Sequence, residues 1–443
     1  MKKLFLLALT LFASNAYAQS TSSTWIDVTS AAYGAKNDCS ADAGPSINVA
    51  ISHAPPGSGV IFFPAGCYLI NTQIVDDNSA AWLSYIGEGN AMLLAQAGTN
   101  GQNIISFGIN TTNGVAYRKI NNLFFNCNNA IRGINADGLH DSEFYDVTIA
   151  KCQSGAHLEA SGPNSYSNRF IGGAIYSPRG VQGVTLGPGA NSWSFFGTKI
   201  IGDPLGCSGD GIDSSANSGA FYGLEVAGWC NGISLQLQTS APPPQQGGVV
   251  ISGSHFLANQ TAILAGNPQV KTAGLSISGN VIDCGGNPNT SNTGGITLAA
   301  ATGFRIVGNQ ITRCTGFSIF GQGPSSAGPP DFGAINGFMG ANFLDPGAQV
   351  SLAGRYNTVT ASLATVSVNY TLNGADSQVN VTGNTAITIP HAMTAQQWTV
   401  FNSGTGNVSL ACDSGTINGQ TSLSLAPQTG KTVTTDGTSC FAL

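Results

Sequence analysis

The sequence predicts an all-β solenoid, in which short strands stack in successive coils. Residues 274–284 (GLSISGNVIDC) return as residues 303–314 (GFRIVGNQITRC), so that Ile277 matches Ile306 and Asn280 matches Asn309. A repeat of about 20 to 50 residues indicates a solenoid, propeller or array. Each unit alternates apolar and polar residues, which is typical of a strand, and leaves no room for a helix. The repeats therefore predict coils built from stacked strands.

The composition supports the same fold class. Glycine accounts for 59 of 443 residues, and charged residues for only 8%, against about a quarter in ordinary domains. Disordered chains show the opposite balance, with high charge and few aromatic or β-branched residues. Frequent turns and buried rows of uncharged polar groups explain the composition better. Asparagine suits both, because it tolerates left-handed turn positions and can form stacked amide ladders.

The first 18 residues are expected to be a secretory signal peptide. Lys2 and Lys3 precede a short apolar run, and Ala16-Tyr17-Ala18 resembles a cleavage site before Gln19. The apolar run is too short to span a bilayer. The net charge of −6, which becomes about −8 without the two lysines, lacks the basic footprint of a nucleic-acid binder. We therefore expect a secreted or periplasmic protein without nucleic-acid partners or membrane insertion.

The next elements follow in a recognisable order. A strand around residues 26–30 precedes a short helix, which Pro45 begins and residues 55–57 (PPG) end. Residues 59–70 then predict a buried strand, a turn and a second strand. The segments IDVTS (26–30), YGAK (33–36), VIFFPAGCYLI (60–70) and IGEG (86–89) resemble the N-terminal entry of the pectate-lyase-like superfamily, which includes polygalacturonases and phage tailspikes. The resemblance implies a right-handed parallel β-helix over residues 19–360, with the short helix as its N-terminal cap.

The ten cysteines are expected to form disulfides between neighbouring coils. A secreted chain permits disulfides, and equivalent positions on adjacent coils lie close enough for the short Cα separations that a disulfide needs. The rival interpretation, a metal cluster, lacks any Cys-x-x-Cys or His pair of zinc spacing. The expected pairs are Cys39 with Cys67, Cys127 with Cys152, Cys207 with Cys230, Cys284 with Cys314, and Cys412 with Cys440.

Residues 361–443 predict a small C-terminal β-domain. The sequence contains short alternating strands, turns at Asn373-Gly374 and Asn418-Gly419, and a hairpin-like segment between Pro390 and Trp398. Several of its segments, including AITIP (386–390) and TDGTSCFAL (435–443), resemble a β-domain at the C-terminus of phage tail fibres and tailspikes. The resemblance implies a module that caps or trimerises a β-helix, or touches a receptor glycan, and therefore a possible homotrimer.

Acidic residues in the central coils are the catalytic candidates. Nine of the 21 acids lie between positions 137 and 225, among them Asp203, Asp210, Asp213 and Glu225. A glycosidase needs two carboxyls, one held protonated and the other ionised. Side chains one coil apart project in line and can supply such a pair. The alternative is that these acids are solvated or cap backbone turns, because no named glycosidase signature surrounds them.

Substrate-binding candidates lie in the same region. His157 and Glu159 alternate with Leu158, which predicts that they share one strand face. Arg169 and Arg179 are the residue type that serves as a lyase base, and Trp193 is an aromatic residue that can stack on sugar. His157 and Glu159 could contact sugar only if they point outward, and no recognisable motif surrounds the two arginines. The alternative for Trp193 is a place in the core. No metal site is expected, although a lyase would use calcium.

Together these features predict a secreted carbohydrate-active enzyme, a glycoside hydrolase or a polysaccharide lyase. Its substrate would be an acidic or branched polysaccharide that binds in a groove along the coils. The acid cluster and the superfamily resemblance favour this hypothesis. The alternative is a non-catalytic glycan-binding adhesin or a tail-fibre-like structural protein, which the C-terminal module and the missing glycosidase motifs favour.

Overall fold

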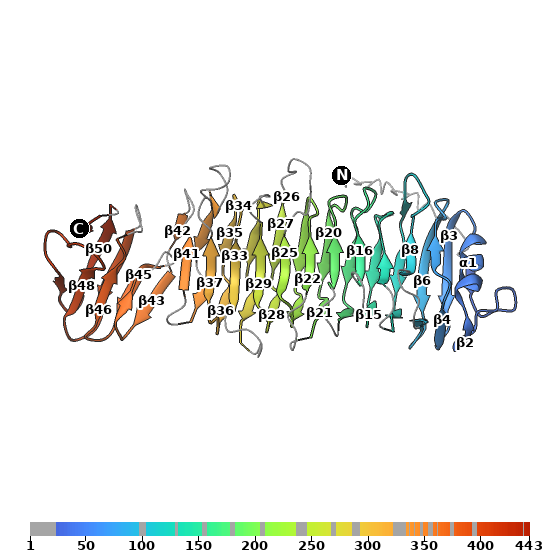
Figure 1. Ribbon diagram of the computed structural model, residues 1–443, viewed down its shortest axis with the longest axis horizontal. Coiled ribbons are helices and arrows are strands. Elements are labelled where there is room, and N and C mark those ends of the chain that lie inside the picture. Colours follow the sequence, from blue (N-terminus) through green and yellow to red (C-terminus); the bar gives the residue numbers. More distant parts are fainter. Residues whose placement is uncertain are drawn as a thin grey trace, which may run out of the picture.

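The computed structural model describes residues 24–96, 103–128, 132–152, 157–177, 182–203, 209–235, 246–266, 272–285, 293–321, 334–335, 337–340, 342–345, 349–352, 358–360, 362–372, 376–391, 397–436 and 438–443. The expected signal peptide therefore lies outside the described residues. Most of the described chain forms an elongated stack of coils, with α1 (Gly44–Ser52) at one end and the C-terminal strands at the other (Figure 1). No helix in these residues is long and apolar enough to cross a membrane.

Three long parallel sheets run along the stack, because the chain adds one strand to each sheet as it completes a coil. Sheet A consists of β1 (Thr24–Asp27), β3 (Gly57–Phe63), β6 (Ala81–Gly87), β10 (Lys119–Asn121), β14 (Glu143–Tyr145), β17 (Arg169–Ile171), β20 (Trp193–Phe196), β23 (Gly219–Tyr222), β27 (Val249–Ser252), β31 (Ser276–Ser278), β35 (Arg305–Val307), β39 (Phe338–Gly340) and β42 (Thr358–Thr360). Sheet B consists of β2 (Asp38–Asp42), β4 (Cys67–Ile70), β7 (Met92–Ala95), β11 (Phe124–Asn126), β15 (Thr148–Ala150), β18 (Ala174–Tyr176), β21 (Lys199–Ile201), β24 (Glu225–Ala227), β28 (His255–Leu257), β32 (Val281–Asp283), β36 (Gln310–Thr312) and β40 (Phe343–Leu344).

Sheet C consists of β5 (Ile74–Asp76), β8 (Asn103–Phe107), β12 (Arg132–Asn135), β16 (Leu158–Ala160), β19 (Val184–Leu186), β22 (Asp210–Ser214), β25 (Asn231–Leu235), β29 (Thr261–Ala265), β33 (Gly294–Leu298), β37 (Phe317–Gly321) and β41 (Gln349–Leu352). Two short sheets cover the turns between sheets C and A, one of β9 (Val115–Ala116) and β13 (Leu139–His140), the other of β26 (Gln246–Gly247), β30 (Thr272–Ala273), β34 (Ala301–Thr302) and β38 (Ala334–Ile335). The expected parallel β-helix is therefore present.

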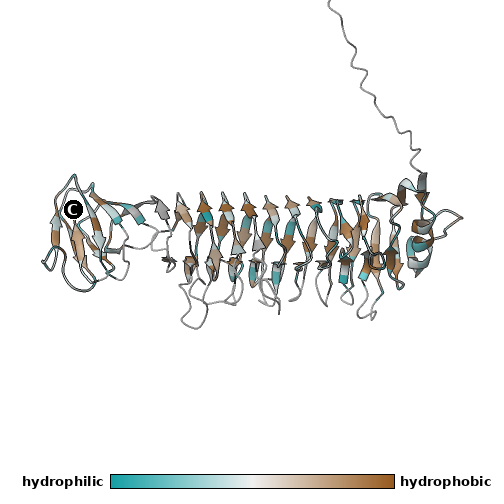
Figure 2. Ribbon diagram, turned by 90° about the horizontal axis from the view of Figure 1, so that it is seen from above, coloured by the Kyte–Doolittle hydropathy of each residue, from teal (hydrophilic) through white to brown (hydrophobic). Residues whose placement is uncertain are grey.

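The core consists of columns of apolar side chains that point inward from the three sheets. Strand residues alternate between the two faces of a sheet, and the parallel register places equivalent residues of successive coils one above another. In sheet A, Phe144, Phe170, Phe195 and Phe221 stack with ring centroids 5.5, 5.7 and 5.9 Å apart. Apolar residues recur along the strands of the stack (Figure 2), and their side chains form one buried core cluster. Burial of each large apolar side chain stabilises the coils by roughly 1.5–3 kcal/mol, but only where a neighbouring coil covers it.

The helix α1 closes the N-terminal end of this core. Its apolar residues Ile47, Ala50 and Ile51 are buried against the first coils. Pro45 stands in the first helical turn, where its missing N–H costs no hydrogen bond. Gly44 is required there, because a Cβ atom would lie 1.9 Å from the carbonyl oxygen of Thr72. The cap predicted from the sequence is confirmed.

An asparagine ladder follows the turns between sheets A and B. The side-chain oxygen of Asn309 accepts hydrogen bonds from the backbone N–H (3.0 Å) and the side-chain amide (2.9 Å) of Asn280. Asn309 in turn donates to the side chain of Asn342 (2.9 Å) and to the carbonyl of Ile277 (3.1 Å). Asn280 and Asn309 are both buried, so these bonds satisfy groups that no solvent reaches. The repeated Gly-Asn pair thus encodes a stacked ladder, as the sequence predicts.

Disulfides connect neighbouring coils along sheet B, and one further disulfide lies in the C-terminal sheets. Four expected pairs are present, Cys39 with Cys67, Cys127 with Cys152, Cys284 with Cys314, and Cys412 with Cys440. Cys230 is also disulfide-bonded, while its expected partner Cys207 lies outside the described residues.

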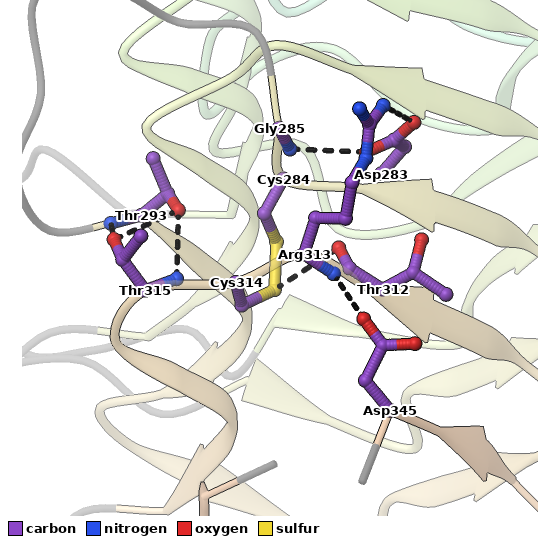
Figure 3. The surroundings of a disulfide bond; sticks show 9 residues. All are labelled: Asp283, Cys284, Gly285, Thr293, Thr312, Arg313, Cys314, Thr315 and Asp345. Atoms are coloured by element: carbon purple, nitrogen blue, oxygen red, sulfur yellow. Dashed lines mark hydrogen bonds and ion pairs between the residues drawn. A yellow bond between two sulfur atoms is a disulfide. The ribbon is translucent and has the colours of Figure 1, made fainter. Parts of the chain in front are cut away.

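Polar contacts surround the bond between Cys284 and Cys314 (Figure 3). Arg313 pairs with Asp283 of the preceding coil, and its backbone N–H donates to Asp345 of the next (2.6 Å). Residues from three successive coils are therefore connected around this disulfide.

The C-terminal strands form two further sheets. One contains β43 (Ser362–Val366), β45 (Asp376–Val381), β47 (Gln397–Asn402), β50 (Thr429–Thr435) and β51 (Cys440–Ala442), and the other β44 (Tyr370–Thr371), β46 (Ala386–Ile389), β48 (Val408–Cys412) and β49 (Leu423–Leu425). Successive strands from β43 to β48 alternate between the sheets and pair in parallel. The hairpin expected between Pro390 and Trp398 is therefore wrong, because β46 and β47 lie in different sheets. The turn at Asn418-Gly419 is confirmed by positive φ at both residues, whereas Asn373-Gly374 lies outside the described residues.

Replacing Asn309 by alanine tests the ladder. The change leaves the backbone N–H of Asn280 and the carbonyl of Ile277 without their partners, and a buried unsatisfied polar group costs about 1–3 kcal/mol. We expect a lower urea midpoint for N309A in equilibrium unfolding followed by circular dichroism. The adjacent Gln310→Ala changes an exposed residue and should lie within about 0.5 kcal/mol of the wild type. Equal urea midpoints for N309A and Q310A would contradict the claim that the asparagine ladder stabilises the fold.

A second test concerns the predicted disulfide between Cys207 and Cys230, of which only Cys230 lies in the described residues. If Cys207 bonds to Cys230, non-reducing peptide mapping by mass spectrometry yields one linked peptide that contains both residues. Titration of the denatured, unreduced protein then finds almost no free thiol. A linked peptide that joins Cys230 to any other cysteine would contradict the nearest-neighbour scheme.

Candidate functional site

The strands of sheet C present two side chains per coil on the surface away from the core. A four-residue pattern recurs, in which two such residues flank a small corner residue and an inward aliphatic residue. The pattern occurs in residues 182–185 (QGVT), 210–213 (DGID), 231–234 (NGIS), 261–264 (TAIL), 294–297 (GGIT) and 317–320 (FSIF). The aliphatic residues pair in register, for example Val184 with Ile212 and Ile212 with Ile233. Residues three apart in one strand therefore share the outer face.

Glycine at the corner position lets this irregular strand pack against the next coil. A Cβ atom on Gly211 would lie 2.5 Å from the carbonyl oxygen of Gly232, and one on Gly183 would lie 2.5 Å from that of Gly211. Such contacts are closer than real Cβ atoms tolerate. The glycines thus place Asp210 and Asp213 together on one side of β22. We call this pair the β22 carboxyl pair.

Polar side chains from adjacent coils surround the β22 carboxyl pair. The Asn231 side-chain amide donates to Asp210 (2.7 Å) and the Gln182 amide donates to Asp213 (2.9 Å). Gln182 is oriented by the Thr185 hydroxyl, which donates to its carbonyl oxygen (2.8 Å). Ser234, the register partner of Asp213, is also buried, and its hydroxyl completes no hydrogen bond of normal geometry. The arrangement leaves one buried donor beside two carboxyls.

The two carboxyls of this pair do not have equal proton affinities. Asp213 is only 9% exposed, and burial together with the nearby charge of Asp210 raises its pKa to about 6. Burial also raises the pKa of Asp210, but the hydrogen bond from the Asn231 amide opposes the rise because it favours the ionised form. Since the groups interact, they titrate as a pair. Both carboxyls therefore bind a proton more readily than an exposed aspartate does.

Glu159 lies on the same face, two coils before Asp213. The register runs from Glu159 to Thr185 and from Thr185 to Asp213, so the two strands are about 9.6 Å apart at a spacing of roughly 4.8 Å per coil. Burial raises the pKa of Glu159, which Arg132 opposes by an ion pair of 2.7 Å. Glu159 therefore extends the acidic group toward the N-terminal end.

The other two acids of the predicted catalytic quartet lie elsewhere. Glu225 lies on β24 of sheet B, where it pairs in register with Lys199 and forms an ion pair of 3.1 Å with it. Asp203 follows β21, in the turn that leaves sheet B. The structure thus brings together Asp210 and Asp213 but does not bring Glu225 to them, because side chains of different sheets point in different directions.

Two predicted substrate-binding residues lie inside the protein, which corrects their assignment. Trp193 is fully buried, stacks on Phe144 and Phe195, and donates from its indole nitrogen to Ser165 (3.1 Å). His157 is also fully buried, because it occupies the corner position that glycine takes in other coils. It therefore does not share a face with Glu159, and neither Trp193 nor His157 can contact a sugar.

The predicted arginines are separate from the β22 carboxyl pair or undescribed. Arg169 lies on β17 of sheet A, exposed and 3.5 Å from Glu143. Arg179 lies outside the described residues. In the part of the chain that the structure describes, no group of three or more His, Cys, Asp or Glu residues is placed to hold a metal ion. Calcium, expected only for a lyase, remains a prediction.

Sequence reasoning missed the polar residues that surround the carboxyls, Gln182, Thr185, Asn231 and Ser234. It also missed the aromatic pair Phe317 and Phe320, whose rings lie 4.9 Å apart on the outer face of β37. The signal that predicts them is the four-residue pattern itself. An outer residue, glycine, an aliphatic residue and a second outer residue recur at coil spacing.

Residues 25–168 match a family model described as rhamnogalacturonase A/epimerase, pectate lyase-like. The chain has a pectate-lyase-like parallel β-helix. This match covers the N-terminal coils and ends before β17, so it does not include the β22 carboxyl pair. Among curated proteins, none matches the sequence.

Solved structures of phage proteins share this parallel β-helix fold. The N-terminal fragment of bacteriophage phi29 gene product 12 has a TM-score of 0.54 at 14% identity, covering 87% of this chain and 70% of that one. Bacteriophage CBA120 tailspike protein 3 has a TM-score of 0.53 at 12% identity, covering 88% of this chain and 60% of that one. A mutant tailspike of E. coli bacteriophage HK620, in complex with a hexasaccharide, has a TM-score of 0.53 at 11% identity, covering 89% of this chain and 83% of that one. At these identities the likeness shows the fold alone.

The buried His157 makes stability depend on pH. Its Nε2 accepts from the Cys152 N–H (3.2 Å) and its Nδ1 lies 3.2 Å from the Gln182 carbonyl, which fixes a neutral ring. Burial lowers its pKa to about 4, whereas the unfolded chain protonates near 6.5. As the pH falls from 6.5 to 4, the unfolded state binds the additional proton, and the native state loses up to about 3 kcal/mol.

Substitution of His157 by glutamine isolates this contribution. H157Q has no imidazole to protonate, so its stability in urea should decline less between pH 6.5 and 4 than that of the wild type. Carboxyls that titrate in the same pH range contribute equally to both proteins, so the difference between the two curves of unfolding free energy against pH reports His157 alone. Parallel curves for the two proteins would show that His157 is not buried in its neutral form.

Proposed function

We propose that this protein is a secreted glycoside hydrolase that cleaves a polysaccharide on the outer face of sheet C. The observation that carries the proposal is the β22 carboxyl pair, two partly or fully buried carboxyls on one face of β22 that adjacent coils supply with different hydrogen-bond donors. Burial raises the pKa of both carboxyls, that of Asp213 to about 6. Two carboxyls whose environments separate their pKa values are what glycoside hydrolysis requires. The family-model match and the parallel β-helix support the substrate class.

The roles follow from the two environments. Asp213, with a pKa of about 6, donates its proton to the oxygen of the scissile glycosidic bond, which then leaves as a hydroxyl. Asp210, whose pKa burial raises and the hydrogen bond from Asn231 lowers in part, acts in its ionised form, in which it stabilises the positive charge that develops on the sugar ring or activates the attacking water. Glu159 is the alternative ionised carboxyl, since it lies on the same face two coils away. Gln182 positions Asp213 through its hydrogen bond.

Substitution of Asp213 by asparagine tests the general acid. We expect kcat for D213N to fall at least a hundredfold, the usual minimum contribution of acid–base catalysis. The wild-type kcat/KM should fall as the pH rises above about 6, because Asp213 then loses its proton, and D213N should lack this decline. Release of reducing ends from a panel of polysaccharides provides the measurement.

Glu225→Gln provides the matched comparison. It removes a carboxylate of the same central coils, but one that pairs with Lys199 on sheet B, so we expect activity near that of the wild type. If E225Q is inactive and D213N is not, the site lies on sheet B instead. If the intact protein cleaves no polysaccharide at any pH, the hydrolase proposal is wrong.

The second candidate is a glycan-binding protein without catalysis. It is favoured by the fold shared with phage tailspikes, one of them in complex with a hexasaccharide, and by the C-terminal sheets at one end of the stack (Figure 1). In this proposal the outer face of sheet C binds the glycan, and the C-terminal domain supports assembly into a homotrimer. Retention by a polysaccharide without any cleavage would favour it over the hydrolase.

A further inference from the structure

The face that carries the β22 carboxyl pair has few charges. From β8 to β37, the described outer positions of sheet C are Asn103, Ser106, Arg132, Asn135, Glu159, Gln182, Thr185, Asp210, Asp213, Asn231, Ser234, Thr261, Leu264, Gly294, Thr297, Phe317 and Phe320. Amides and hydroxyls predominate among them. Such groups donate and accept hydrogen bonds without requiring a charged partner.

The charges that are present do not favour an anionic ligand. Arg132, the one cation among these described positions, is engaged by Glu159 at 2.7 Å. Asp210 and Asp213 have no cationic partner among the contacts of this face. Cations lie instead on the other two sheets, for example Lys199. A polyuronate carries a carboxylate on each sugar, and like charges brought together across an interface cost several kcal/mol.

An aromatic pair lies on this face toward its C-terminal end. Phe317 is 40% exposed and its ring lies 4.9 Å from that of Phe320. The register leads from β22 through β25, β29 and β33 to β37, which is four coils or about 19 Å from the β22 carboxyl pair. An exposed apolar ring presents a flat surface to the C–H face of a sugar, and Thr261 and Thr297 lie on the outer face between the two ends.

We infer that this face binds an uncharged polysaccharide, laid along the axis of the β-helix from the β22 carboxyl pair to Phe317 and Phe320. The inference rests on the proposed function for the position of the reactive groups and adds the class of substrate and its direction. Of the acidic or branched polysaccharides predicted from the sequence, it excludes the acidic class. Ser106 and Ser234 are buried. The groups that bind sugar hydroxyls are therefore the half-buried hydroxyls of Thr185, Thr261 and Thr297. The aromatic pair anchors the distal end of the chain.

Binding, not cleavage, tests the class of substrate, so that failure of the hydrolase and failure of this inference are distinguishable. Wild-type protein is run in native gels that contain either a neutral polymer (dextran, a galactomannan or a neutral bacterial O-polysaccharide) or a uronate polymer (polygalacturonate or alginate). Retardation by at least one neutral polymer and by neither uronate is the expected result. Retardation by a uronate polymer, or by none of the polymers, would overturn the inference.

Substitution of Phe317 by alanine tests the direction of the bound chain. With the neutral polymer that retards the wild type, F317A should bind about tenfold more weakly, the order expected for loss of one aromatic contact. Phe343→Ala is the matched control, because Phe343 is 63% exposed but lies on β40 of sheet B. Wild-type binding by F317A, or an equal loss in both variants, would show that the chain does not extend to β37.

Discussion

The structure depends on the parallel hydrogen-bonded register between successive coils. Each strand pairs with the equivalent strand of the next coil at about 4.8 Å, and sheets A, B and C keep this pairing from the helix α1 to β42. Side chains at equivalent positions must therefore line up in columns. A column of phenylalanines, a ladder of asparagines and a track of amides and hydroxyls are three results of one constraint. Each column is stable only because its members repeat.

The same register explains how two carboxyls come together on sheet C. In a regular strand, outer residues alternate with inner ones, so that neighbours on one face are two residues apart. The corner glycines of sheet C add one residue, and two outer side chains then flank a buried pair in each coil. In β22 both outer residues are aspartates, three positions apart. A regular strand places residues three apart on opposite faces. The irregularity brings like charges together, and burial makes their protonation unequal.

The sequence predicted most of the fold because its signals are local and repeated. Residues 274–314 contain the coil period, the glycines with positive φ and the asparagines of the ladder. The cysteine pairs follow once the coils are assumed to stack, because equivalent positions then lie close together. The site was predicted only in part, because the decisive information is the side to which a residue points. Glu225 and Asp213 look alike in sequence, yet one lies on sheet B and the other on sheet C. His157 and Glu159 alternate around Leu158, but the corner in this coil turns His157 inward.

Buried ionisable groups near the site affect stability in opposite directions. The native pKa of Asp213, about 6, exceeds its unfolded value near 3.9, so the native state binds the proton first and gains stability as the pH falls from 6 toward 4. His157 has the opposite sign, since its native pKa of about 4 lies below the unfolded value. Asp213 therefore costs about 3 kcal/mol at neutral pH, where it is ionised and buried. The stacked coils hold this carboxyl in place despite that cost, because its strand is paired on both sides and cannot relax alone. A carboxyl that would otherwise move into solvent is thereby kept buried, with a raised pKa.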